Sequence, residues 1–134
     1  MSISQVVPFF MVTDMARSLR FYVDGLGFTR KNQWIVEEQI RWCWLQRDTA
    51  ALMLQVYLQG RAPEKLGVGT SLCFQCEDSI ALYREFLSRG LEPREPFVGN
   101  GLWDTHIIDP DGYHLHFNSP TDVPEETRLS EWAR

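Results

Sequence analysis

The fold is decided by residues 7–28, VPFFMVTDMARSLRFYVDGLGF, in which the spacing of apolar side chains changes at Asp14. Before this residue, positions 6–12 form a continuous apolar run of strand length. After it, apolar residues recur at intervals of four, three and four, which places on one face of a helix Met15, Leu19, Tyr22 and Leu26. Asp14 stands where a helix N-cap belongs, and Gly25 or Gly27 ends the helix because glycine readily adopts a left-handed conformation. The stretch therefore predicts a strand followed by a helix.

Three more strands are predicted after this helix, over residues 28–36, 39–47 and 50–58. The polar breaks between them are only two residues long, and breaks that short favour antiparallel hairpins. Residues 59–69, QGRAPEKLGVG, contain three glycines and one proline without periodicity, which is typical of a linker. The first half of the chain, residues 5–58, thus has the order βαβββ.

The same pattern recurs in the second half, with an offset of 64 residues between Asp14 and Asp78 (78 − 14). A strand run over residues 70–76 precedes Asp78, which stands at a second helix N-cap. We expect the apolar stripe of this helix at Ile80, Tyr83 and Leu87. Gly90 then ends the helix.

Three further strands complete the second half, over residues 91–98, 102–108 and 113–118. The last two are joined by residues 109–112, DPDG, which place proline and glycine where a tight turn favours them. Residues 70–118 therefore repeat the βαβββ order. A repeat of this length indicates two copies of one module, each with an apolar sheet face that must be covered.

The tail, residues 119–134, is polar except at three positions, which are Val123, Leu129 and Trp132. Pro124 could open a short helix in it. The sequence leaves open whether the tail packs on the rest of the chain.

The composition excludes several classes of protein. With 44% hydrophobic and 23% charged residues, and no apolar run of about 18 residues, the chain is expected neither to be disordered nor to interact with a membrane. The net charge of −5 comes without a basic patch, so no nucleic-acid partner is expected. The N-terminus lacks the basic start and long apolar stretch of a secretory signal, which predicts a cytoplasmic protein. No motif for a hydrolase or a kinase is present.

The three cysteines, Cys43, Cys73 and Cys76, are odd in number and lie in apolar, strand-like runs. This pattern argues against a disulfide framework. Cys73 and Cys76 have the C-x-x-C spacing, but the sequence LCFQC alternates like a strand rather than a zinc or redox motif. We therefore interpret both as strand cysteines.

Two stretches, VPFFMVTDMARSLRFYVDGLGF (residues 7–28) and IIDPDGYHLHF (residues 107–117), resemble the vicinal oxygen chelate superfamily. This superfamily holds glyoxalase I, extradiol dioxygenases, fosfomycin-resistance enzymes and bleomycin-resistance proteins, and the resemblance covers residues 5–119. It implies one α+β domain over residues 1–134, in which two βαβββ modules form a curved mixed-sheet half-barrel around a cavity. It also implies a homodimer.

In metal-dependent members, each module contributes two inward ligands, one from its first strand and one from its last. The resemblance places these positions at Val7, Gln55 (or Leu54), Ser71 and His116. Val7 cannot bind a metal and serine is a poor ligand, whereas a catalytic site needs about three protein ligands. The chain therefore looks most like the bleomycin-resistance subset, which lacks the ligands, and no cofactor is favoured.

The hypothesis that follows is a metal-free cleft that sequesters a small aromatic or cationic molecule. Trp42 and Trp44 are two residues apart on a predicted strand, so both indoles share one face. Large flat side chains suit an aromatic or cationic ligand, although each could equally belong to a core or to an interface. The expected ligand-binding residues are Phe9, Met11, Trp42, Trp44, Gln55, Tyr57, Ser71, Cys73, Trp103 and His116.

Two alternatives remain open. The first is a metal-dependent lyase, isomerase or dioxygenase of the same superfamily, in which Ni, Zn, Mn or Fe is held by His116 with His114 or His106, and with Gln55 as a further ligand. His114 and His116 share a strand face, as a chelating pair would. The second alternative is a non-catalytic domain whose aromatic surface binds a partner.

Overall fold

The computed structural model describes residues 1–57 and 66–132, and the chain divides into two compact units, Met1–Leu66 and Gly67–Arg134. Most of the predicted linker lies outside the described residues, and residues 66–69 form a turn. Each unit has its own four-stranded sheet and its own helix packed on that sheet.

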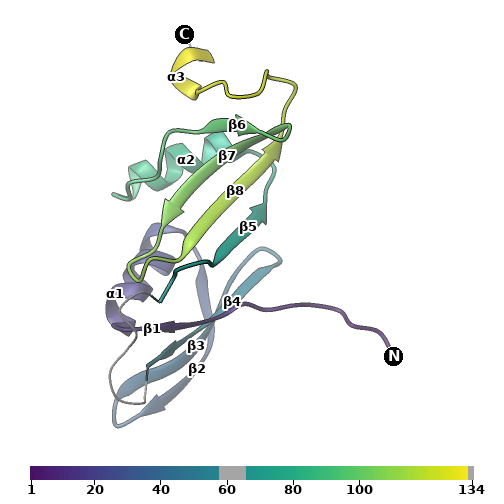
Figure 1. Ribbon diagram of the computed structural model, residues 1–134. Helices are drawn as coiled ribbons and strands as arrows, with labels where there is room; N and C mark the ends of the chain where they lie inside the picture. Colours follow the sequence, from purple (N-terminus) through teal and green to yellow (C-terminus); the bar gives the residue numbers. More distant parts are fainter. Residues whose placement is uncertain (58–65, 133–134) are drawn as a thin grey trace. The chain divides into compact units, whose positions relative to one another are not determined.

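The first unit forms one sheet with the order β1-β4-β3-β2, in which β1 runs parallel to β4 and the other pairs are antiparallel (Figure 1). Its elements are β1 (Phe9–Val12), α1 (Met15–Leu19), the π-helical turn η1 (Arg20–Gly25), β2 (Thr29–Val36), β3 (Gln39–Arg47) and β4 (Ala50–Val56). The predicted first helix is therefore present, but its second half is wound more widely, and Leu26 N donates to Phe21 O at 2.8 Å.

The second unit repeats this arrangement with the order β5-β8-β7-β6, in which β5 runs parallel to β8. Its elements are β5 (Ser71–Gln75), α2 (Ser79–Ser88), β6 (Phe97–Gly99), β7 (Leu102–Ile108), β8 (His114–Pro120) and α3 (Leu129–Trp132). The two predicted βαβββ modules are confirmed, and β3 and β7 have the predicted bounds.

The two helices begin in the same way, as the repeat predicts. Asp14 accepts a hydrogen bond from Arg17 N at 3.0 Å, and Asp78 accepts one from Ala81 N at the same distance. Each carboxylate thus satisfies an amide that has no partner within the first helical turn. Both N-cap predictions are confirmed.

The predicted strand over residues 91–98 is largely wrong, because only Phe97–Gly99 forms β6. Pro93 and Pro96 lack the N–H groups that a strand interior needs. Arg94 N donates to His106 O instead, which ties this irregular segment to β7.

The predicted apolar stripe of the second helix also needs a correction. Leu87 is 45% exposed, whereas the neighbouring Phe86 is fully buried. The Phe86 ring packs edge-on against Phe117 of β8, with ring centroids 5.1 Å apart. Contact with the sheet, rather than the spacing of leucines, therefore selects the buried face of α2.

The turn at residues 109–112 is confirmed, and it is packed more closely than the sequence indicated. Asp109 accepts hydrogen bonds from the backbone N–H groups of Asp111 and Tyr113, both at 2.9 Å, and Gly112 has a φ of +90°. A Cβ at Gly67 would lie 2.1 Å from the carbonyl carbon of Gly112. Gly67 is therefore required for this close backbone approach.

Each sheet has one covered face and one open face. In the first unit the covered face packs against α1 and η1, and its fully buried side chains include Val12, Tyr22, Cys43, Leu45, Leu52 and Leu54. In the second unit the covered face packs against α2, and the buried side chains there include Trp103, Thr105, Ile107, Leu115 and Phe117.

The tail packs onto the second unit rather than lying loose. Leu129 is buried in a cluster with Ile80, Val98 and Trp103. The helix in the tail begins at Leu129, so Pro124 does not open it. Within the described residues, no helix is long and apolar enough to cross a membrane.

Candidate functional site

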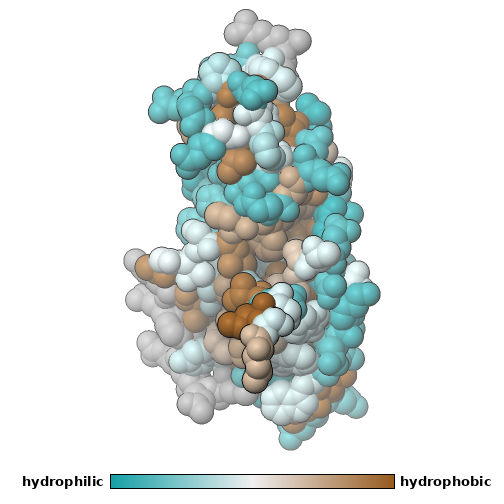
Figure 2. Space-filling model, turned by 90° about the vertical axis from the view of Figure 1, so that its right-hand side faces the viewer, coloured by the Kyte–Doolittle hydropathy of each residue, from teal (hydrophilic) through white to brown (hydrophobic). Residues whose placement is uncertain are grey.

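The open face of the first sheet carries mainly aromatic and thioether side chains. Strand pairing aligns them in two rows across the sheet, which are Met11, Gln55, Trp42 and Trp34 in one and Phe9, Met53, Trp44 and Asn32 in the other. Phe9 is 47% exposed and Trp34 is 50% exposed. Figure 2 shows that apolar patches also occur among polar residues on the molecular surface it presents. Large apolar groups therefore remain in contact with water on this face.

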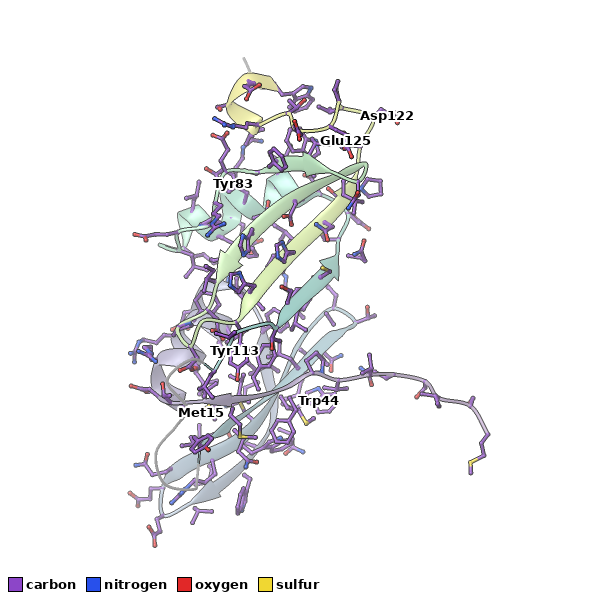
Figure 3. All side chains as sticks on the ribbon, in the orientation of Figure 1. Met15, Trp44, Tyr83, Tyr113, Asp122 and Glu125 are labelled. Carbon is purple, nitrogen blue, oxygen red and sulfur yellow. The ribbon has the colours of Figure 1, made fainter. Side chains whose placement is uncertain are left out.

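Trp42 and Trp44 share this face, as predicted, but their indole N–H groups differ. Trp44 Nε1 donates to Gln46 Oε1 at 3.1 Å, and Gln46 Nε2 donates to the Asp48 carbonyl at 3.1 Å. This chain of hydrogen bonds holds the Trp44 ring, which Figure 3 labels, in one orientation. Trp42 Nε1 has no hydrogen-bond partner within residues 1–57 and 66–132. Its N–H is therefore available to a ligand.

The open face of the second sheet is polar. Strand pairing aligns Ser71 with His114 and Ile108, Cys73 with His116 and His106, and Gln75 with Asn118 and Asp104. Ser71 and Cys73 are exposed, and the three imidazoles are half-buried. This face therefore offers donors and acceptors where the first sheet offers rings.

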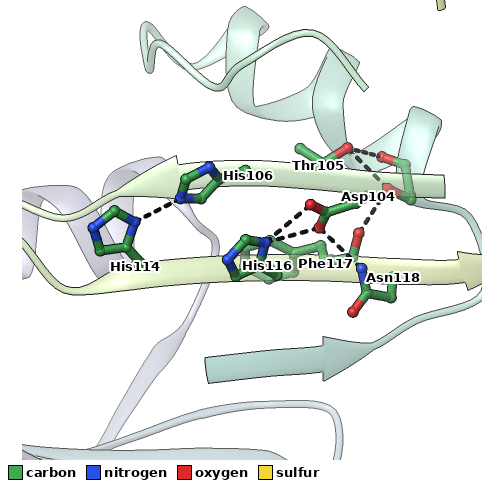
Figure 4. Close-up of polar contacts among 8 residues, drawn as sticks. Asp104, Thr105, His106, His114, His116, Phe117 and Asn118 are labelled. Atoms are coloured by element: carbon green, nitrogen blue, oxygen red, sulfur yellow. Dashed lines mark hydrogen bonds and ion pairs between the residues drawn. The ribbon is translucent and has the colours of Figure 1, made fainter. Parts of the chain in front are cut away.

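Two hydrogen-bonded groups involve these imidazoles (Figure 4). His106 Nε2 lies 2.8 Å from His114 Nδ1. His116 Nδ1 contacts both carboxylate oxygens of Asp104, at 2.9 and 3.1 Å, and Asn118 Nδ2 donates to the same carboxylate at 2.9 Å. Sequence reasoning assigned no carboxylate to this face, so it missed Asp104. The signal that could have found it is the tight turn at 109–112, which sets the register of β7 against β8.

His106 is the imidazole with the most perturbed environment. Its ring stacks on that of His116, with centroids 4.3 Å apart and an angle of 8° between the planes. Burial, and then the positive charges of His116, Arg94 and His114, lower the pKa of His106 to about 4. His106 is therefore neutral at neutral pH.

These imidazoles do not fit the expected metal centre. The lone pairs of an imidazole lie in the plane of its ring, so the parallel rings of His106 and His116 cannot both point at one ion. Across residues 1–57 and 66–132, no three or more His, Cys, Asp or Glu side chains are arranged to hold a metal ion.

The four ligand positions that the resemblance implied differ in their surroundings. Val7 precedes β1, and Ser71 is an exposed serine on β5. Gln55 lies on the open face of β4, whereas the alternative residue Leu54 is fully buried in the core. His116, on β8, contacts Asp104.

The expected ligand-binding residues divide between the two sheets. Phe9, Met11, Trp42, Trp44 and Gln55 share the open face of the first sheet, and Tyr57 follows β4 directly. Ser71, Cys73 and His116 share the open face of the second sheet.

Trp103 was expected among these residues, and the structure corrects this expectation. It is 5% exposed and lies on the covered face of β7, within the cluster that contains Ile80, Val98 and Leu129. Alternation along β7 places Asp104 and His106, rather than Trp103, on the open face.

Comparisons with known proteins agree with this architecture. Residues 2–117 match the family model described as Glyoxalase/Bleomycin resistance protein/Dioxygenase superfamily. A search of curated proteins finds no match.

Several solved structures share the fold. The bleomycin resistance determinant encoded on the transposon Tn5 has a TM-score of 0.72 and 22% identity, over 90% of this chain and 100% of that one. TnmS3, an antibiotic binding protein from Streptomyces sp. CB03234, has a TM-score of 0.70 and 22% identity, over 90% and 99%. TioX from Micromonospora sp. ML1 has a TM-score of 0.70 and 18% identity, over 87% and 98%.

Proposed function

Because this chain belongs to the glyoxalase/bleomycin resistance protein/dioxygenase superfamily, we propose that it binds and sequesters a small aromatic or cationic organic molecule without a catalytic metal. The observation that carries this proposal is the open face of the first sheet. Two of its tryptophans, Trp42 and Trp44, stand side by side on β3, and the rows that contain them extend over all four strands.

The spacing of the two indoles suits a flat ligand. Side chains two residues apart on a strand are separated by about 7 Å. Aromatic rings attract one another at centroid distances of about 4.5–7 Å, so one ligand ring can contact both indoles. A cationic ring system would gain further from the negative faces of the indoles. Trp42 Nε1 and Gln55 supply hydrogen bonds that orient the ligand.

Two of the structural neighbours support sequestration as the mode of action. One is described as an antibiotic binding protein and another as a bleomycin resistance determinant. A protein that removes a compound by binding needs an affinity and a stoichiometry, and no reacting group. The aromatic face of the first sheet meets that requirement.

The test is a titration with ethidium, a planar aromatic cation, followed by tryptophan fluorescence quenching and by calorimetry. We expect saturable binding that Trp42→Ala and Trp44→Ala each weaken about tenfold. The matched control is Trp132→Ala, which removes an exposed tryptophan of α3. Equal affinity in all four proteins would contradict the proposed site, and no binding to any of them would contradict the function.

A second experiment tests the metal-free part of the proposal. Metal-depleted protein is re-equilibrated with Ni, Zn, Mn or Fe(II), and the bound metal per chain is measured. We expect well below one ion per chain, because the stacked imidazoles do not converge. One ion per chain, lost in the His116→Ala protein, would overturn this part and favour the metal-dependent alternative.

A further inference from the structure

The second unit holds a hydrogen-bonded group that the proposed aromatic site does not use. His116 Nδ1 lies 2.9 and 3.1 Å from the two oxygens of the Asp104 carboxylate. An ionised carboxylate can only accept hydrogen bonds, so Nδ1 must carry the proton. The other ring nitrogen of neutral His116, Nε2, therefore presents a lone pair.

The positions of the ring and of the carboxylate are well supported. Asn118 Nδ2 donates to Asp104 Oδ1 at 2.9 Å, and the His106 ring stacks on the His116 ring at 4.3 Å. These contacts hold the tautomer and the ring plane together. Asp104 and Asn118 thus act as positioning residues for His116.

The lone pair of Nε2 is unused and accessible. The side chain of His116 is 24% exposed and that of Asp104 is 27% exposed. Within residues 1–57 and 66–132, Nε2 of His116 has no hydrogen-bond partner. A half-exposed acceptor with a fixed direction selects a ligand group that can donate a proton.

We propose that His116 Nε2 is the binding point for the acidic hydroxyl of a phenol, at a site that lies wholly within the second unit. On binding, the phenol O–H bond breaks and its proton passes to Nε2. The ligand is then held as a phenolate beside an imidazolium whose positive charge Asp104 stabilises. The reaction transfers one proton and needs no other reactant.

The choice of a phenol follows from the charges at the site. A carboxylic acid has already lost its proton at neutral pH, and its negative charge would face that of Asp104. An aliphatic alcohol holds its proton too strongly to transfer it. A phenol still carries its proton, since the phenol of tyrosine has a pKa of about 10. Electron-withdrawing ring substituents bring that value closer to the pKa of an imidazole, which favours the transfer.

The test compares 4-nitrophenol with 4-nitroanisole, which has the same ring and lacks the hydroxyl proton. The titrations are run below the pH at which free 4-nitrophenol ionises, where only the phenolate absorbs visible light. We expect excess protein to generate the phenolate band, and 4-nitrophenol to bind at least about tenfold more tightly than 4-nitroanisole.

Two variants isolate the role of the proton. In Asp104→Asn, the new amide N–H donates to Nδ1 and leaves the proton on Nε2, so the acceptor becomes a donor. In His116→Phe, the stacked ring is kept and both nitrogens are lost. We expect both variants to lose the visible band and the tenfold preference. Gln75→Ala, on the same open face, and Trp42→Ala, in the first unit, should retain both.

Several outcomes would overturn the inference. These are equal affinity for the two compounds, no binding of 4-nitrophenol, or a phenolate band that persists in Asp104→Asn. Nitrogen-15 NMR of the ligand-free protein gives an independent readout, in which a proton on Nε2 rather than Nδ1 of His116 would also overturn it. Because ethidium binding is measured separately, the inference can fail while the proposed function stands.

Discussion

The open faces of the two sheets have the same strand order and opposite chemistry. On the first sheet, Trp42 and Trp44 lie in rows with a phenylalanine and two methionines. On the second, His116 and His106 lie beside Asp104, Asn118 and an exposed cysteine. The covered faces have not diverged in this way, because both are apolar and both meet a helix. Within each module, the covered face maintains the fold and the open face is free to acquire a ligand.

The largest expected effect concerns the covered faces, which this comparison holds to be equivalent. Tyr22 and Phe86 are fully buried, one in each unit. We expect Tyr22→Ala and Phe86→Ala each to lower the free energy of unfolding by about 3–5 kcal/mol, measured by urea denaturation. The control is Leu87→Ala, next to Phe86 but 45% exposed, which should change it by less than about 0.5 kcal/mol. A large loss in Leu87→Ala would show that the buried face of α2 has been misassigned.

The next prediction contrasts a cysteine on a covered face with one on an open face. Burial raises the pKa of Cys43 to about 11, from an ordinary value of 9.0. That difference of 2 (11 − 9.0) reduces its thiolate fraction about a hundredfold near neutral pH. We expect iodoacetamide to label exposed Cys73 first and Cys43 only after unfolding, as read by peptide mass spectrometry. Rapid labelling of Cys43 in the native protein would contradict its burial.

The helix caps offer a smaller test of the equivalence. Asp14→Ala and Asp78→Ala each remove a carboxylate that accepts from a backbone N–H three residues on, at 3.0 Å. Each should cost about 0.5–2 kcal/mol of stability, and the two losses should be similar. Asp14→Asn and Asp78→Asn keep an acceptor oxygen and should recover most of the loss in thermal denaturation. A loss confined to one unit would break the equivalence.

The smallest effect is a pH dependence confined to the second open face. The pKa of His106 is lowered to about 4, chiefly by burial, so the unfolded chain binds this proton more readily than the folded one. The contribution of neutral His106 to stability is therefore fully present above about pH 6.5, and it is lost as the pH falls toward 4. An NMR titration of the His106 ring should show a midpoint near 4. A midpoint near 6.5 would mean that the ring is neither buried nor close to other positive charges.

Much of the fold could be predicted because its signals are local. Asp14 and Asp78 mark both helix starts, and the turn at residues 109–112 fixes one hairpin. The strand over residues 91–98 was overextended, because its apolar residues outweighed the missing N–H groups of Pro93 and Pro96. A local pattern shows that a segment is apolar, and backbone hydrogen bonding decides whether it is a strand.

The candidate site was less predictable, because it depends on which face of each strand is covered. Alternation along β7 separates Trp103 from Asp104 and His106 in the sequence, but it does not show which set meets the helix. Trp103 was assigned to the open face because of its ring, and it lies in the core. Asp104 was overlooked because its contact with His116 is diagonal, and such a contact follows only from the register of β7 and β8.

The central claim is that the first open face binds an aromatic ligand through Trp42 and Trp44. The most direct measurement is a titration with ethidium followed by the indole N–H signals of all five tryptophans in a nitrogen-15 correlation spectrum. The account predicts large shifts for Trp42 and Trp44, and unchanged signals for Trp103 and Trp132 in the second unit. Shifts confined to Trp103 and Trp132, or no shift at saturation, would contradict it.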